Sequence, residues 1–95
     1  MSKAFAGAID GISVLATTTV VLAADRYREA VVLSNDSDET IYVAIGTAAV
    51  MNDGIRIPVA GTIVIIADHG AALAINAICT SGTKNLCVQT LIRNG

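Results

Sequence analysis

The residues that could do chemistry in this chain are few and widely separated. His69 is the single histidine, and Cys79 and Cys87 are the only cysteines. One histidine gives neither a paired-histidine metal site nor a convincing Ser–His–Asp arrangement, and two cysteines without a CxxC pair lack the ligands of a structural zinc site. We expect His69 to be a loop residue. We assign no catalytic, metal-binding or cofactor-binding residue.

The two cysteines flank the last predicted turn of the chain. Cys79 and Cys87 could approach each other across that hairpin, but a shift of one residue in register would move one of them to the opposite face. Free, largely buried thiols are the expected state in a reducing cytoplasm.

Three carboxylates stand close together in one turn. Asp36, Asp38 and Glu39 superficially resemble a calcium loop, but Ile41 occupies the position where an EF-hand requires glycine. A solvated acidic turn is therefore expected. The glycines are isolated and lack the spacing of a phosphate-binding loop. Without a nucleophile, a base pair or a metal set, the chain is not expected to be an enzyme or to hold a cofactor.

The charge balance argues against nucleic acid as a partner. The net charge is −2 and the isoelectric point is near 5.0, whereas a nucleic-acid binder needs a basic stripe. The basic residues are scattered, and only Arg26 and Arg28, on either side of Tyr27, form a local pair. We interpret this pair as the solvated start of a strand.

A membrane-spanning segment is not expected either. A spanning helix needs about 20 mostly apolar residues, whereas the uncharged stretch at 11–24 is shorter and contains three threonines at 17–19. Two features are typical of a signal peptide: Lys3 precedes an apolar stretch, and residues 21–23 resemble a cleavage site. Asp10 interrupts that stretch, so we expect no leader.

The elements that must position these residues are β-strands. Val, Ile and Thr make up about a third of the chain, and β-branched side chains favour strands. Strands are predicted at 12–22, 29–34, 40–45, 55–59, 62–67, 72–79 and 86–92. Turns are predicted at 35–38, 52–54, 60–61, 68–70 and 81–83. Short strands at this spacing indicate an all-β, antiparallel β-sandwich of about seven strands, of the jelly-roll or Ig-like kind.

Two segments leave the secondary structure open. Residues 47–51 have the composition of a short helical turn, because alanine and methionine favour helix and Thr47 can cap one. Residues 71–77 are rich in alanine and could form a helix of two turns. Alternation of Leu73, Ile75 and Ala77 with their neighbours favours a strand there.

Several strands are apolar on both faces. Ile41, Val43 and Ile45 share one face of their strand, while Tyr42 and Ala44 share the other. The chain is 54% hydrophobic and 15% charged, against about 25% charged in ordinary soluble domains. An isolated sandwich should have a polar outer face. We therefore expect another protein subunit to cover part of the surface, most simply in a homo-oligomer.

Three segments resemble small structural proteins of tailed phages. Residues 30–46 contain a strand that ends in Ser-Asn-Asp-Ser-Asp and leads into an Ile-Tyr strand and a glycine; 52–57 and 77–88 resemble the next turn and the closing hairpin of those proteins. The resemblance covers about 28–90. It implies an antiparallel β-sandwich of the kind found in head decoration and tail proteins.

The resemblance implies a non-enzymatic decoration, or cement, protein that stabilises a phage head by bridging capsid subunits. Its partners would be the major capsid protein and copies of itself, preferably in a trimer. It would lie on the capsid surface of the virion after assembly in the bacterial cytoplasm. The alternative is a tail or tail-fibre module that binds a receptor or carbohydrate, which the scarcity of aromatic residues disfavours. A subunit of a cellular assembly or a secreted sandwich domain also stays open.

The expected organisation is an N-terminal arm and first strand at 1–25 and a β-sandwich module at 26–95. Residues 2–19 are rich in small side chains and lie outside the resemblance. They could add an extended strand to the sheet edge of a capsid subunit. The other interpretation is an ordinary first strand of the sandwich.

Overall fold

The computed structural model describes residues 4–66 and 70–94, with side chains for 7–66 and 70–92. Within these residues the chain forms eight antiparallel strands and no helix, so no helix there is long and apolar enough to cross a membrane. The predicted all-β sandwich is confirmed. The strands are β1 (Ala4–Val14), β2 (Thr19–Leu22), β3 (Arg28–Asn35), β4 (Ile41–Ile45), β5 (Ile55–Ile57), β6 (Thr62–Ile66), β7 (Ile75–Ile78) and β8 (Lys84–Asn94).

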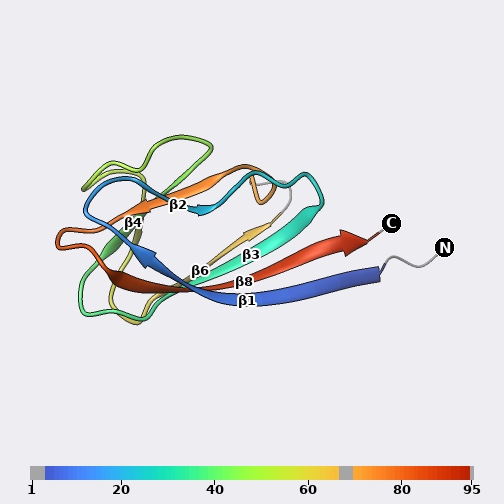
Figure 1. Ribbon diagram of the computed structural model, residues 1–95, viewed down its shortest axis with the longest axis horizontal. Coiled ribbons are helices and arrows are strands. Elements are labelled where there is room, and N and C mark those ends of the chain that lie inside the picture. The colour runs from blue at the N-terminus through green and yellow to red at the C-terminus, as the bar shows by residue number, and fades with distance from the viewer. Residues whose placement is uncertain (1–3, 67–69, 95) are drawn as a thin grey trace.

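The strands form two four-stranded sheets that pack face to face (Figure 1). We call the sheet with order β1-β8-β3-β6 sheet A and the sheet with order β2-β7-β4-β5 sheet B. In sheet A, β1 pairs with β8 along its whole length, from Ala4 opposite Asn94 to Val14 opposite Lys84. β1 and β6 are consequently the edges of sheet A, and β2 and β5 are the edges of sheet B.

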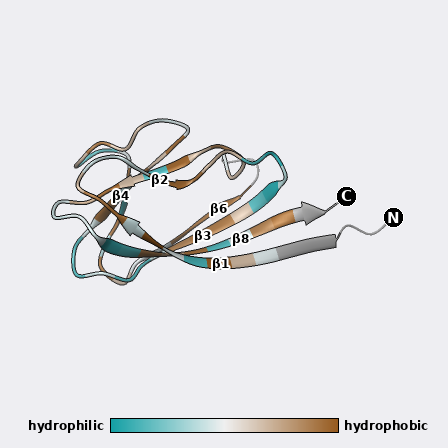
Figure 2. Ribbon diagram, viewed as in Figure 1, coloured by the Kyte–Doolittle hydropathy of each residue, from teal (hydrophilic) through white to brown (hydrophobic). Residues whose placement is uncertain are grey.

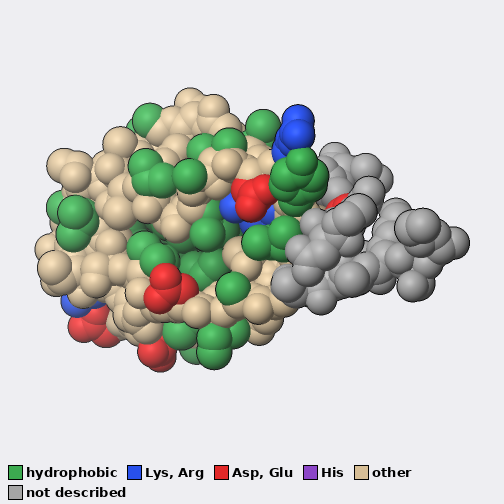
Figure 3. Space-filling view, turned by 45° about the vertical axis from the view of Figure 1, so that its right-hand side comes forward, with side chains coloured by type: hydrophobic (Ala, Val, Ile, Leu, Met, Phe, Trp, Pro, Cys, Tyr) green, Lys and Arg blue, Asp and Glu red, His purple; other side chains and the backbone are tan. Residues whose placement is uncertain are grey.

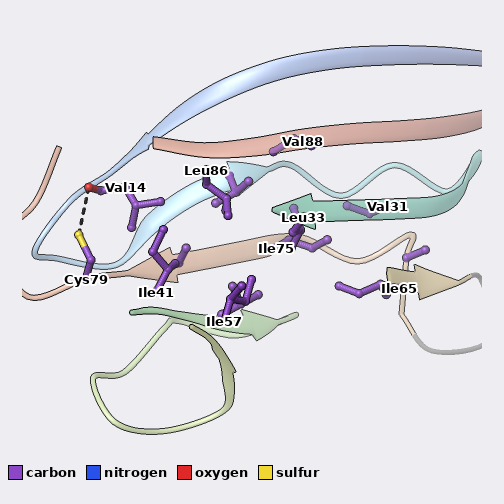
Figure 4. Close-up of a cluster of buried hydrophobic side chains, with 14 residues drawn as sticks. Val14, Val31, Leu33, Ile41, Ile57, Ile65, Ile75, Cys79, Leu86 and Val88 are labelled. Carbon is purple, nitrogen blue, oxygen red and sulfur yellow. Dashed lines mark hydrogen bonds between the residues drawn. The ribbon is translucent and has the colours of Figure 1, made fainter. Parts of the chain in front are cut away.

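The core lies between the inner faces of the two sheets (Figure 4). Because side chains alternate across a strand, β3 buries Val31 and Leu33 completely and turns Val32 outward. Ile41 and Ile57 approach from sheet B and are also fully buried. Apolar residues recur along the strands of both sheets, as the hydropathy colouring shows (Figure 2).

The predicted strand at 12–22 is wrong as a single element. β1 ends at Val14 and β2 starts at Thr19. Between them the Leu15 amide donates to the Thr19 hydroxyl at 3.0 Å, and that hydroxyl donates to the Thr17 carbonyl at 2.9 Å. The Thr19 hydroxyl thus bonds to the local backbone both as acceptor and as donor, and such local bonds compete with the pairing of a continuous strand. This break gives eight strands where about seven were expected.

Residues 4–14 form the ordinary first strand of the sandwich. The backbone of Ala4–Val14 pairs with β8 on one side, as the interpretation as an ordinary first strand requires. The addition of this edge strand to the sheet of a capsid subunit stays a prediction. β1 and β2 lie in different sheets. The predicted division of the chain at residue 25 stays a prediction.

Several other boundaries differ from those expected. Residues 47–51 contain no helix; the chain turns there, and the Asp53 amide donates to the Val50 carbonyl at 3.2 Å. Residues 71–74 form a turn, so the strand expected at 72–79 is reduced to Ile75–Ile78. β5 ends at Ile57 because Pro58 has no amide proton to donate. The Pro58 carbonyl accepts a hydrogen bond from the Gly61 amide at 2.8 Å, which closes a turn.

Candidate functional site

The residues considered first for chemistry gather into no metal site within the part of the chain that the structure describes. His69 lies outside the described residues. Among residues 4–66 and 70–94, no three or more His, Cys, Asp or Glu side chains gather where they could hold a metal ion. The expectation that the chain is not an enzyme stays a prediction.

The acidic turn holds the chain together at one end of the sandwich. The Asp38 carboxylate lies 2.7 Å from the Lys84 ammonium, and the Glu39 carboxylate accepts bonds from the amide, at 2.9 Å, and the hydroxyl of Ser81. The bond from Lys84 lowers the pKa of Asp38, and the bonds from Ser81 lower the pKa of Glu39. The turn between β3 and β4 is therefore tied to the β7–β8 hairpin rather than being only solvated.

The two cysteines are free, as predicted, but their surroundings differ. Cys79 is fully buried and its thiol donates to the Val14 carbonyl at 3.3 Å (Figure 4). Burial raises the pKa of that thiol. Cys87 is only half-buried and lies on the outward side of β8, opposite Gly11 and Ser34. The expectation of two largely buried thiols is correct for Cys79 and wrong for Cys87.

Arg28 was predicted as a solvated residue, and this is wrong. Only 5% of it is exposed, and its guanidinium donates to the carbonyls of Ala71, Ala23 and Leu73 at 2.6, 3.0 and 2.8 Å. Burial lowers the pKa of Arg28, and nearby Asp25 opposes this shift. The guanidinium joins the start of β3 to the segments beside β2 and β7. Nothing in the sequence separates Arg28 from its exposed neighbour Arg26.

The candidate functional site is the outer face of sheet A. Ladder pairing places its outward side chains in rows that cross the sheet from β1 to β6. The first row is Gly11, Cys87, Ser34 and Thr62; the second is Ile9, Gln89, Val32 and Val64; the third is Gly7, Leu91, Ala30 and Ile66. None of these residues is charged. Ile9 is 80% exposed and Val64 is 63% exposed. Such a face departs from the polar alternation of a solvated sheet.

The second row is a ridge and the first row is a trough. A groove of about 520 Å³ follows the trough, lined by Gly11, Cys87 and Ser34 and bounded by Ile9, Val32 and Gln89. Asp10 and Val88 complete the lining from intervening positions of β1 and β8. The trough exists because its residues are small. The alternation of apolar residues predicted outer faces that another subunit covers. It could not single out this face, because its rows combine residues from four separate strands.

The outer face of sheet B is different. Residues 46–54, which connect β4 to β5, are bonded to this face. The side-chain amide of Asn76 donates to the Thr47 carbonyl at 2.6 Å, and the Tyr42 hydroxyl donates to the side-chain oxygen of Asn52 at 3.1 Å. The face also carries the exposed charge of Arg56. In Figure 3, hydrophobic side chains are exposed at several points of the surface, and charged side chains are few.

Comparison with known proteins shows a similarity of fold but not of sequence. No known protein-family profile matches the sequence, and no curated protein matches it. Among solved structures, the chain is similar to one of Bacillus endospore appendages, described as a novel family of disulfide-linked pili. The TM-score is 0.58 at 12% sequence identity, over 100% of this chain and 93% of that chain. At this identity the likeness shows that the two chains share a β-sandwich fold.

Proposed function

We propose that this chain is a non-enzymatic structural subunit that works by packing against other protein subunits. The observation that carries the proposal is the exposed, uncharged outer face of sheet A. Contiguous apolar patches on a soluble domain are typical of protein–protein contacts. The fold likeness to a pilus protein supports the same class of role.

In its finer form, the proposal is a decoration protein of a tailed-phage head, bound to the major capsid protein. The support is the resemblance of 28–90 to small phage structural proteins. Its segments correspond to β3, β4 and the β7–β8 hairpin, which are the interior strands of the two sheets, and to the edge strand β5. The trimeric state and the location on the capsid surface belong to this proposal.

Immunogold electron microscopy of virions tests the finer proposal. Antibodies raised against the purified protein should label phage heads at regular positions. Label confined to tails would favour the tail or tail-fibre alternative and contradict decoration. Virions without label, alongside positive label on the major capsid protein, would contradict a place in the virion.

A second candidate function is that of a filament subunit. The fold shared with the Bacillus appendage protein over the whole of this chain favours it. Head-to-tail contacts between identical subunits give open filaments when the rotation between subunits does not close. Negative-stain electron microscopy of the concentrated protein should then show filaments of uniform width. Discrete particles only would contradict this candidate.

A further inference from the structure

We propose that two copies of this chain pack face to face through the outer faces of sheet A, with the ridge of each copy in the trough of the other. The inference rests on the proposed role as an assembling subunit and names the surface and the partner. The ridge is the row Ile9, Gln89, Val32 and Val64, and the trough is the row Gly11, Cys87, Ser34 and Thr62.

The register of sheet A makes this face self-complementary. Ridge and trough are neighbouring rows, separated by two residues along each strand, or about 6.6 Å. A two-fold axis that runs parallel to the rows and midway between them exchanges their positions. It places each ridge over the partner's trough, with β1 above β1 and β6 above β6. This is the isologous contact of a closed dimer, and a chain that associates through it alone is a dimer instead of the trimer of the finer proposal.

The charge distribution favours a second copy as the occupant of this face. Each copy carries a net charge of −2, so two copies repel each other wherever their acidic residues approach. No charged side chain belongs to the rows of this face, so the rows themselves bring no like charges together. Asp10 lines the groove from the intervening position of β1 and is the acidic residue that the contact brings toward its own copy. The outer face of sheet B carries Arg56 and its own connecting loop instead.

The size of the face is sufficient for a specific but reversible contact. Ridge and trough rows about 6.6 Å apart on four strands about 4.8 Å apart give about 250 Å² of flat footprint. Overlap of the third row with the Ser13–Asn85 pair beyond the trough, on β1 and β8, brings it to about 400 Å². Side chains corrugate that footprint, so two copies together bury about 1,000 Å², the lower bound for a specific interface. For an interface at this lower bound we expect a dissociation constant on the order of micromolar.

The same geometry decides what happens to Cys87. Two packed sheets lie about 10 Å apart, and the row offset adds about 6.6 Å along the strands, so the two Cys87 Cα atoms lie about 12 Å apart. A disulfide requires Cα atoms within about 7 Å. The contact therefore covers the Cys87 thiol without cross-linking the copies.

Analytical ultracentrifugation of paired variants tests the contact. Val64→Asp places a charge on the ridge, whereas Val20→Asp places the same charge on the outward side of edge strand β2 in sheet B. The two valines are matched, at 63% and 64% exposed. The wild type and Val20→Asp should associate equally, and Val64→Asp should raise the dissociation constant at least about tenfold. Ile9→Lys provides a second ridge variant, and circular dichroism checks that each variant is folded.

Native Cys87 supplies an independent readout. Its alkylation by a small iodoacetamide probe should slow at least about fivefold when the wild type is raised from far below to far above its dissociation constant. Buried Cys79 serves as the internal control. If the wild type associates but Val64→Asp associates as tightly and Cys87 is not protected, the face-to-face contact is wrong while the role as an assembling subunit stands. If the wild type stays monomeric and also labels no virion and forms no filament, both fail.

Discussion

The outer faces of the two sheets, alike in their strand patterns, are covered in different ways. On sheet B, the connection between β4 and β5 lies against its own sheet through bonds from Asn76 and Tyr42. On sheet A, Ile9 and Val64 stay exposed. An apolar strand face can thus be covered by a loop of the same chain or be left for another molecule.

The difference shows why apolar alternation alone overstates the need for a partner. Tyr42 and Ala44 share the outward side of β4. The alternation pattern predicts cover by another subunit for them just as it does for Val32 and Val64. Ala44 lines a hollow together with Thr47 and Val50 of the connecting loop. Val20, at the edge of sheet B, is as exposed as Val64. The continuous rows of uncharged side chains across all four strands, rather than exposure alone, therefore favour sheet A as the expected contact.

The largest expected effect tests whether the inner faces of the two sheets are equivalent. Leu33→Ala in sheet A and Ile41→Ala in sheet B each remove a fully buried side chain. Each should lower the free energy of unfolding by about 2–5 kcal/mol, because a cavity adds to the lost burial. Urea unfolding of the dilute monomer measures this. Val32→Ala, on the outer face beside Leu33, is the control and should cost less than about 1 kcal/mol.

Arg28 tests how strongly the two sheets are joined. Arg28→Met keeps much of the side-chain volume but leaves the carbonyls of Ala71, Ala23 and Leu73 without these donors. The free energy of unfolding should fall by about 1–3 kcal/mol. Exposed Arg56 is the matched control, and Arg56→Met should change stability by less than about 0.5 kcal/mol. Equal effects of the two variants would contradict the role assigned to Arg28.

Asn76→Ala addresses the cover of sheet B directly. Loss of the 2.6 Å bond to the Thr47 carbonyl should cost about 1 kcal/mol. Amide hydrogens at 47–53 should exchange faster, while those of β3 and β8 in sheet A keep their rates. Gln89→Ala, on the outer face of sheet A, should leave exchange at 47–53 unchanged. A uniform increase over both sheets would show that the loop is not a local cover.

The smallest effect is expected from pH, and it should not distinguish the two outer faces. The pKa values of Asp38 and Glu39 are lowered from ordinary values of 3.8 and 4.5 by their bonds to Lys84 and Ser81. Their stabilising contribution is therefore present above those ordinary values and is lost as pH falls through the lower folded-state values. Thermal unfolding of the wild type and of an Asp38→Asn, Glu39→Gln variant should differ at pH 7. The difference should disappear once the pH lies below the lowered folded-state pKa values of both carboxyl groups. A constant difference at all pH values would contradict this origin.

The sequence by itself determined the fold class. The abundance of Val, Ile and Thr and the turn residues at 35–38, 52–54 and 81–83 specify short antiparallel strands, because backbone preference and side-chain alternation are local properties. The free state of both thiols was also predicted. Local competition from the Thr19 hydroxyl was not predicted, and it accompanies the division of the predicted first strand into β1 and β2.

Only the tertiary structure decided which surfaces are bare and which polar groups are buried. Arg28 became a buried donor because the carbonyls of Ala71 and Leu73, from a distant part of the sequence, converge on it together with the carbonyl of Ala23. Arg26 instead donates to the hydroxyl of its neighbour Tyr27. Cys87 joined Gly11 and Ser34 in a trough because the register of β1, β8 and β3 aligns them. Register is a non-local property, set when the inner faces of both sheets meet, and one residue of slip would turn every side chain of a strand to its other face.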